Sequence, residues 1–136
     1  MRVVLDTNVL MSAVFFGGWP YRVLESWREG KVEIAVSEAI LEEYRSVGDR
    51  LSREFPGVEV GPFLELLSIN AKVYRVPDLP SRVCQDSDDD KFLACALASG
   101  TKVIISGDRA LQKVSGYAGI RVLSPRQFAE EFLTSE

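Results

Sequence analysis

The sequence contains no histidine, and this absence removes several classes of enzyme. Ser-His-Asp and Cys-His nucleophilic sites, HExxH zinc sites and imidazole acid–base chemistry all require that side chain. The two cysteines, Cys84 and Cys95, are too far apart for a CxxC pair and have no histidine to complete a metal site. Cys95 falls in an apolar helical stretch, which predicts a buried, inert thiol. Any catalysis must therefore use carboxylates, hydroxyls, lysine or arginine.

Long apolar runs are also missing, since no stretch approaches the roughly 18 residues of a membrane span. The N-terminal segment lacks the longer apolar region and cleavage site of a signal peptide. We therefore expect a cytoplasmic protein without membrane contact. The length of 136 residues, with 46% hydrophobic and 26% charged residues, predicts a single globular domain over residues 1–136.

A positive charge excess is absent as well, because the formal net charge is −4. A simple nucleic-acid binder would normally be basic. A negative net charge is still compatible with nucleic-acid binding if several acids hold divalent cations, because the site would then present metal charge to a phosphate.

Strands and helices are predicted to alternate along the chain. Alternation of this kind indicates right-handed βαβ units and a mostly parallel sheet of about five strands, with helices on both faces in a three-layer α/β/α sandwich. In such folds ligands bind beyond the carboxyl ends of the strands, where the strand order reverses. The predicted strands are 3–5, 33–36, 71–76, 103–106 and 121–123. The predicted helices are 9–15, 20–28, 37–51, 63–69, 92–98 and 125–133, with a loop over 77–87.

Three acidic residues stand out by their place in these elements. Asp6 and Asp108 each follow the end of a predicted strand, so both can point into the crevice above the sheet. Glu43 lies at the edge of the apolar stripe of its helix, whereas Glu42 falls on the solvent side.

The run of acids over residues 86–90 opens the next helix. Asp89 shares a face with Leu93 and Ala96, which turns it toward the sheet. Asp90 is rotated by one residue and is the less central candidate. Asp86 or Asp88 is free to cap the helix.

The simplest interpretation of these acids is that they are helix caps and solvated charges, because helix N-termini favour acids without any function. Asp6 fits that interpretation poorly, since a carboxylate directly after a buried strand is costly unless something pairs with it. Four acids converging on one crevice would repel one another unless cations lie between them. Oxygen ligands without histidine or cysteine suit Mg²⁺ or Mn²⁺, whose natural chemistry at such a site is phosphodiester hydrolysis.

Four segments in this order resemble a PIN domain, and specifically the PIN proteins that act as toxins of prokaryotic toxin–antitoxin pairs. The resemblance covers the whole chain, and it implies an α/β/α sandwich that cleaves single-stranded RNA with Mg²⁺ or Mn²⁺ held by three or four acids. It places the first acid on Asp6, the second on Glu43 and the fourth on Asp108. The third is Asp89 or Asp90; Asp89 is preferred for its helical face, and Asp90 is kept as a further metal ligand. The segments are Leu5-Asp6-Thr7-Asn8-Val9, Ser37 to Tyr44, Asp86 to Leu93, and Ser106-Gly107-Asp108-Arg109-Ala110-Leu111.

The same resemblance implies supporting residues around the acids. Asn8 is expected to be structural, Asp86 to support or cap, and Ser106 to order Asp108 or a water. Lys91 and Arg109 are close in sequence to the acids and are candidates for phosphate contact. Surface solvation is the slightly favoured interpretation for both.

The leading hypothesis is thus a metal-dependent endoribonuclease. A non-catalytic PIN-type module that binds RNA or a partner protein is the alternative, and it predicts the loss of one or more acids. A phosphotransfer enzyme with Asp6 as nucleophile ranks last, because the haloacid dehalogenases carry a second Asp where this chain has Asn8.

The two tryptophans lie in the region that forms dimer and antitoxin surfaces in toxin relatives. Trp27 follows Leu24 at helical spacing, which favours packing, whereas Trp19 stands between Gly18 and Pro20 and is expected to be exposed. We therefore expect a homodimer and a cognate antitoxin protein.

Overall fold

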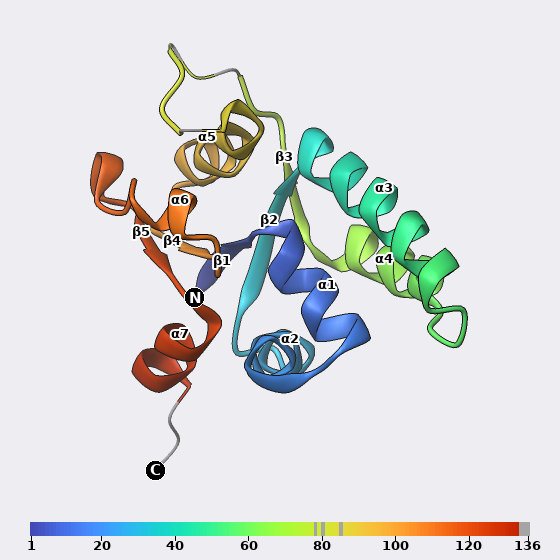
Figure 1. Ribbon diagram of the computed structural model, residues 1–136. Coiled ribbons are helices and arrows are strands. Elements are labelled where there is room, and N and C mark those ends of the chain that lie inside the picture. Colours follow the sequence, from blue (N-terminus) through green and yellow to red (C-terminus); the bar gives the residue numbers. More distant parts are fainter. Residues whose placement is uncertain (78, 80, 85, 134–136) are drawn as a thin grey trace.

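A central sheet of five parallel strands organises the computed structural model (Figure 1), which describes residues 1–77, 79, 81–84 and 86–133. The order β3-β2-β1-β4-β5 places β1 in the middle, paired with β2 on one side and β4 on the other. The predicted α/β class is confirmed, and the sheet is entirely parallel. The strands are β1 (Arg2–Leu5), β2 (Glu33–Ser37), β3 (Lys72–Tyr74), β4 (Val103–Ile105) and β5 (Arg121–Leu123).

Helices cover both faces of this sheet and complete the predicted three-layer sandwich. The first four helices lie on one face together with the last helix, which packs against α2, while α5 packs against β1, β2 and β4 from the other face (Figure 1). The helices are α1 (Thr7–Phe15), α2 (Gly18–Arg28), α3 (Glu38–Glu54), α4 (Val60–Asn70), α5 (Asp90–Ser99), α6 (Arg109–Gln112) and α7 (Pro125–Phe132), with 3₁₀ turns η1 (Ser87–Asp89) and η2 (Tyr117–Gly119).

Local signals set the helix ends as the sequence predicts. The Ser37 hydroxyl accepts a 3.2 Å hydrogen bond from the backbone N–H of Ile40 at the start of α3. Ser124 caps α7 in a reciprocal capping box with Gln127. Gly100 ends α5 in the left-handed conformation, with φ of 70°, where a side chain would be strained.

Several boundaries differ from the prediction: α1 and α2 each begin two residues early, and α3 runs on to Glu54. Helix α4 begins at Val60, three residues before the predicted start, while α5 begins at Asp90 after the 3₁₀ turn η1. Strand β3 is shorter than predicted because it is an edge strand that pairs only with β2. The turns α6 and η2 were not predicted, since elements of three or four residues show no periodicity. Residues 78, 80 and 85 of the predicted loop and 134–136 lie outside the described residues.

The buried core is continuous through both helical layers. Its largest members include Phe92 of α5 and Phe128 of α7, and strand β1 is almost fully enclosed. Both cysteines are buried, which confirms the prediction for Cys95. Trp27 packs edge-on against Phe63, with 6.2 Å between ring centroids, which confirms that its role is packing. Within the part of the chain that the structure describes, no helix is both long and apolar enough to cross a membrane.

One buried hydrogen bond ties α3 to the end of β1. The hydroxyl of Tyr44, itself fully buried, donates to the carbonyl of Leu5 at 2.6 Å. This bond fixes the backbone immediately before Asp6.

Removing that hydroxyl should therefore destabilise the fold. We expect Tyr44→Phe to lower the free energy of unfolding by about 1–2 kcal/mol, the usual effect of losing a buried hydrogen bond. Chemical denaturation followed by circular dichroism measures this value. Tyr21→Phe, at an exposed tyrosine of α2, is the control and should change it by no more than ~0.5 kcal/mol. Equal stability of the two variants would contradict the role of this bond.

Candidate active site

The strand order reverses between β1 and β4. Strands β2 and β3 extend the sheet on one side of β1, and β5 extends it beyond β4 on the other side. Asp6 follows β1 directly, and its backbone N–H donates to the carbonyl of Ile105 at the end of β4 at 3.0 Å. Asp108 lies three residues after Ile105. Both acids therefore stand at the crevice where ligands bind in sheets of this type.

Asp6 is buried, with 5% of its surface exposed, and the groups of the described residues that donate to its carboxylate are neutral. The hydroxyl of Ser106 donates to its Oδ2 at 2.6 Å, and the backbone N–H of Asn8 is a further donor. No ion pair within the described ranges involves Asp6. Burial raises the pKa of Asp6, and the negative charges of Asp108 and Glu43 raise it further. A buried carboxylate in this state favours a proton or a cation beside it.

Ser106 connects the two strand-end acids. While it donates to Asp6, its oxygen accepts a 3.0 Å hydrogen bond from the backbone N–H of Asp108. The side chain of Gln112 donates to the carbonyl of Ser106 at 2.8 Å. Sequence reasoning assigned Ser106 to Asp108 and missed its bond to Asp6.

Asp108 uses one carboxylate oxygen to start a helix. Its Oδ1 accepts from the backbone N–H of Ala110 at 2.8 Å and caps α6. Among the described residues, Oδ2 takes part in no hydrogen bond, so it remains available at the crevice.

Asp89 faces the other acids across the crevice. Burial raises its pKa to about 6, and the negative charges of Asp6, Asp108, Asp86 and Glu43 add to this rise. The four predicted acids are therefore close enough to repel one another. Asp86 caps the turn η1 through a 3.0 Å bond from the N–H of Asp88.

Asp90 does not share this environment. Its carboxylate accepts the backbone N–H groups of Cys84 at 2.7 Å and Val83 at 3.2 Å. Burial alone would raise the pKa of Asp90, but these hydrogen bonds outweigh burial and lower it. The carboxylate thus fastens the preceding loop to α5, and the geometry favours Asp89 as the third acid.

Glu43 is the acid that has a cationic partner. One of its oxygens accepts from the hydroxyl of Thr7, and the other pairs with the ammonium of Lys91. Glu42 points to solvent, as the helical stripe predicted. The slightly favoured interpretation of Lys91 as a solvated surface residue is wrong, because its side chain is 22% exposed and ion-paired.

The contacts of Glu43 were missed because they join residues far apart in sequence. Thr7 and Lys91 lie 36 and 48 residues from Glu43, and no local pattern reports such pairs. Arg109 is exposed at the start of α6, and the side chain of Asn8 is exposed near Gly107 and Asp108.

The donors at this crevice fit a hard divalent cation in kind. Asp6, Asp89 and Asp108 offer oxygen ligands, and their excess negative charge is what Mg²⁺ or Mn²⁺ would offset. Glu43 could join them by exchanging Lys91 for a metal ion. No three acids or thiols in the described part of the chain already converge as a metal site, so binding requires the carboxylates to draw together.

Comparison with known proteins agrees with this geometry. The sequence profile of the PIN domain family matches residues 2–110, and the chain belongs to this family. The matched region contains all four predicted acids. PIN domains are usually nucleases and typically bind divalent metal ions.

A full-length relative is also found. The chain is similar to the uncharacterized protein MJ1680 of Methanocaldococcus jannaschii, at 32% identity over 145 aligned positions. The alignment covers 97% of this chain and 92% of the relative.

The repulsion at Asp89 has a measurable consequence for stability. An ordinary aspartate has a pKa of about 3.9, whereas Asp89 in the fold has a pKa of about 6. The folded state therefore binds the proton more tightly, and Asp89 lowers stability as pH rises from about 4 through 6. We expect Asp89→Asn to be more stable than wild type at pH 7 in chelator, with little difference at pH 4.

Urea denaturation at the two pH values measures this effect. Asp88→Asn, at the exposed neighbour of Asp89, is the matched control and should leave the pH dependence unchanged. An Asp89→Asn variant no more stable than wild type at pH 7 would contradict the repulsion.

Proposed function

We propose that this chain is a metal-dependent endoribonuclease that hydrolyses phosphodiester bonds of single-stranded RNA in the cytoplasm. The observation that carries the proposal is the buried carboxylate of Asp6 at the point where strand order reverses. It lies within electrostatic reach of three other acids and pairs with no cation among the described residues. A non-catalytic module has no need for that arrangement, because it lowers stability without gaining chemistry.

Each residue of the crevice has a role in this proposal. Asp6, Asp89 and Asp108 would hold Mg²⁺ or Mn²⁺, and Ser106 keeps the Asp6 carboxylate turned toward Asp108. When bound, the metal supplies a water of lowered pKa and positive charge beside the phosphate.

Glu43 and Lys91 complete the arrangement. Thr7 and Lys91 hold the Glu43 carboxylate at the rim of the acid cluster. If Glu43 turns to a metal, the ammonium of Lys91 becomes free to contact the RNA phosphate. This exchange would provide a positive charge where the net charge of the chain is −4.

The first test is cleavage of a mixed-sequence single-stranded RNA by the purified protein with Mn²⁺ or Mg²⁺. We expect Asp6→Asn to lower the rate by at least about a hundredfold, as loss of a metal ligand typically does. EDTA should abolish cleavage in wild type. Glu42→Gln, on the solvent face of α3, is the matched control and should retain the wild-type rate.

Calorimetric titration with Mn²⁺ separates the alternatives. Binding without cleavage would indicate a restricted substrate, and neither binding nor cleavage in a folded protein would favour a non-catalytic RNA- or protein-binding module. Cleavage that survives in Asp6→Asn would refute the assignment of the site.

We further propose that the chain forms a homodimer and acts as the toxin of a toxin–antitoxin pair. The support is a band of exposed apolar side chains on α2 and α4, where Tyr21 and Leu66 border a groove of about 410 Å³. Trp19 is also exposed, and the guanidinium of Arg22 lies 4.9 Å from its ring centroid.

Light scattering during size exclusion at low micromolar concentration tests the dimer. We expect wild type to elute as a dimer and Leu66→Asp to shift toward monomer, because it places a charge in an apolar contact. Leu97→Asp, at an exposed leucine of α5 on the opposite face, is the control. A monomeric wild type would count against the dimer.

A further inference from the structure

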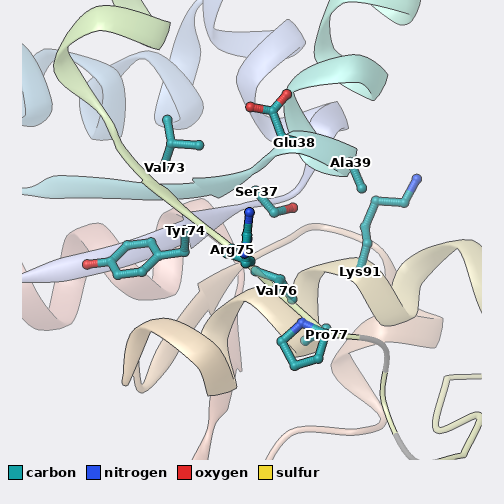
Figure 2. Close-up of a pocket in the computed structure, with 10 residues that line it drawn as sticks. Ser37, Glu38, Ala39, Val73, Tyr74, Arg75, Val76, Pro77 and Lys91 are labelled. Carbon is teal, nitrogen blue, oxygen red and sulfur yellow. The ribbon is translucent and has the colours of Figure 1, made fainter.

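A second groove lies beside the acids, at the carboxyl ends of β2 and β3 (Figure 2). Its volume is about 550 Å³, within the range of pockets that bind small organic groups. The last residue of β2 and the first turn of α3 line one wall, β3 and the chain after it line another, and α5 closes a third. The lining residues are Ser37, Glu38, Ala39, Val73, Tyr74, Arg75, Val76, Pro77, Lys91 and Ala94.

This groove and the acid cluster share one edge of the sheet. All five strands are parallel, so their carboxyl ends meet there, and β2 is the direct neighbour of β1. Neighbouring strands lie about 4.8 Å apart, which sets the groove one to two strands away from Asp6. Lys91 belongs to both places, since it lines the groove and pairs with Glu43.

One of the two cations in the groove has no ion-pair partner among the described residues. Arg75 is exposed just after β3, and its guanidinium pairs with no acid in the described ranges, whereas Lys91 is already paired. Figure 2 shows Lys91 on one side of the groove and Val73 and Tyr74 on the other. An unpaired guanidinium beside an opening is well suited to a phosphate oxygen.

The rest of the lining is mostly apolar. Val73, Val76 and Ala94 present hydrocarbon surface, and Val73 leaves 45% of its surface exposed. Tyr74 has one ring face covered by Arg2, whose guanidinium carbon lies 5.5 Å from the ring centroid. Among the described lining residues, Glu38 is the acid, and its charge would oppose a phosphate.

We propose that this groove binds the nucleotide adjacent to the scissile phosphate, with Arg75 on a backbone phosphate and the base against the apolar wall of Val73, Val76 and Ala94. The inference rests on the proposed function for the identity of the substrate as RNA. A base that enters the groove must leave any duplex, so the groove selects unpaired strands. An apolar contact accepts every base, so it adds affinity without much sequence preference.

The main test compares two variants that each lose one positive charge, one at the start of β3 and one just after its end. Arg75→Gln removes it at the groove, and Lys72→Gln removes it from the exposed start of β3. Binding of a short fluorescein-labelled single-stranded RNA is followed by anisotropy in Mn²⁺, with both changes made in the Asp6→Asn background and the RNA checked for integrity afterwards. We expect Arg75→Gln to raise Kd about tenfold and to reduce the salt slope by about one, as loss of one phosphate contact does. Lys72→Gln should leave Kd within about twofold, because its charge is solvent-screened.

A second pair of variants should act in the opposite direction. Glu38→Gln removes the acid from the groove, and Glu42→Gln removes one from the solvent face of the same helix. We expect Glu38→Gln to lower Kd severalfold and Glu42→Gln to leave it unchanged. Both substitutions are compatible with a helix, so loss of folding does not confuse the comparison.

Duplex RNA of the same sequence tests entry of the base. We expect duplex binding to be weaker than single-strand binding in wild type and insensitive to Arg75→Gln. Equal effects of Arg75→Gln and Lys72→Gln on single-stranded RNA, or equal losses for both forms of RNA, would overturn the inference. If wild type cleaves RNA and Arg75→Gln does not change RNA binding, the groove proposal alone is refuted. If Arg75→Gln weakens binding but wild type does not cleave RNA, the nuclease proposal alone is refuted.

Discussion

Mutual repulsion among carboxylates at one edge of the sheet is the constraint on which the rest of this structure depends. Asp6, Asp89 and Asp108 lie within electrostatic reach of one another, and Asp6 is also removed from water. Neutral donors offset part of the cost, through the hydroxyl of Ser106 and the N–H groups of Asn8 and Ala110. These bonds orient the carboxylates without neutralising them, which leaves a demand for positive charge.

The scaffold keeps the acids from relieving that repulsion by moving apart. Asp6 extends from a strand that is hydrogen-bonded on both sides, and the bond from Tyr44 to Leu5 holds α3 against the same strand. Asp108 is tied to its place by its role as a helix cap and by Ser106. A cation would therefore meet acids whose main-chain positions are set by the fold, and their side chains would draw together around it.

Local patterns were sufficient to predict the strand-end acids but not their partners. A carboxylate directly after a buried strand is visible in sequence, as is the side of a helix on which Glu43 lies. The contacts of Glu43 with Thr7 and Lys91 depend on how three separate elements pack, so no pattern along the chain reports them. The groove around Arg75 escaped notice for the same reason, since its walls come from β2, β3, α3 and α5.

The neighbours Asp89 and Asp90 show how a genetic scan could mislead. Asp90 binds the N–H groups of Val83 and Cys84, so its loss would release the loop that leads into η1 and displace the residue beside it. Under the proposed function, alanine at either position would lower the rate of RNA cleavage, and a scan of activity would score both acids as metal ligands. The loss at Asp90 would reflect release of the loop that its charged carboxylate holds, whereas the loss at Asp89 would reflect removal of an acid from the crevice.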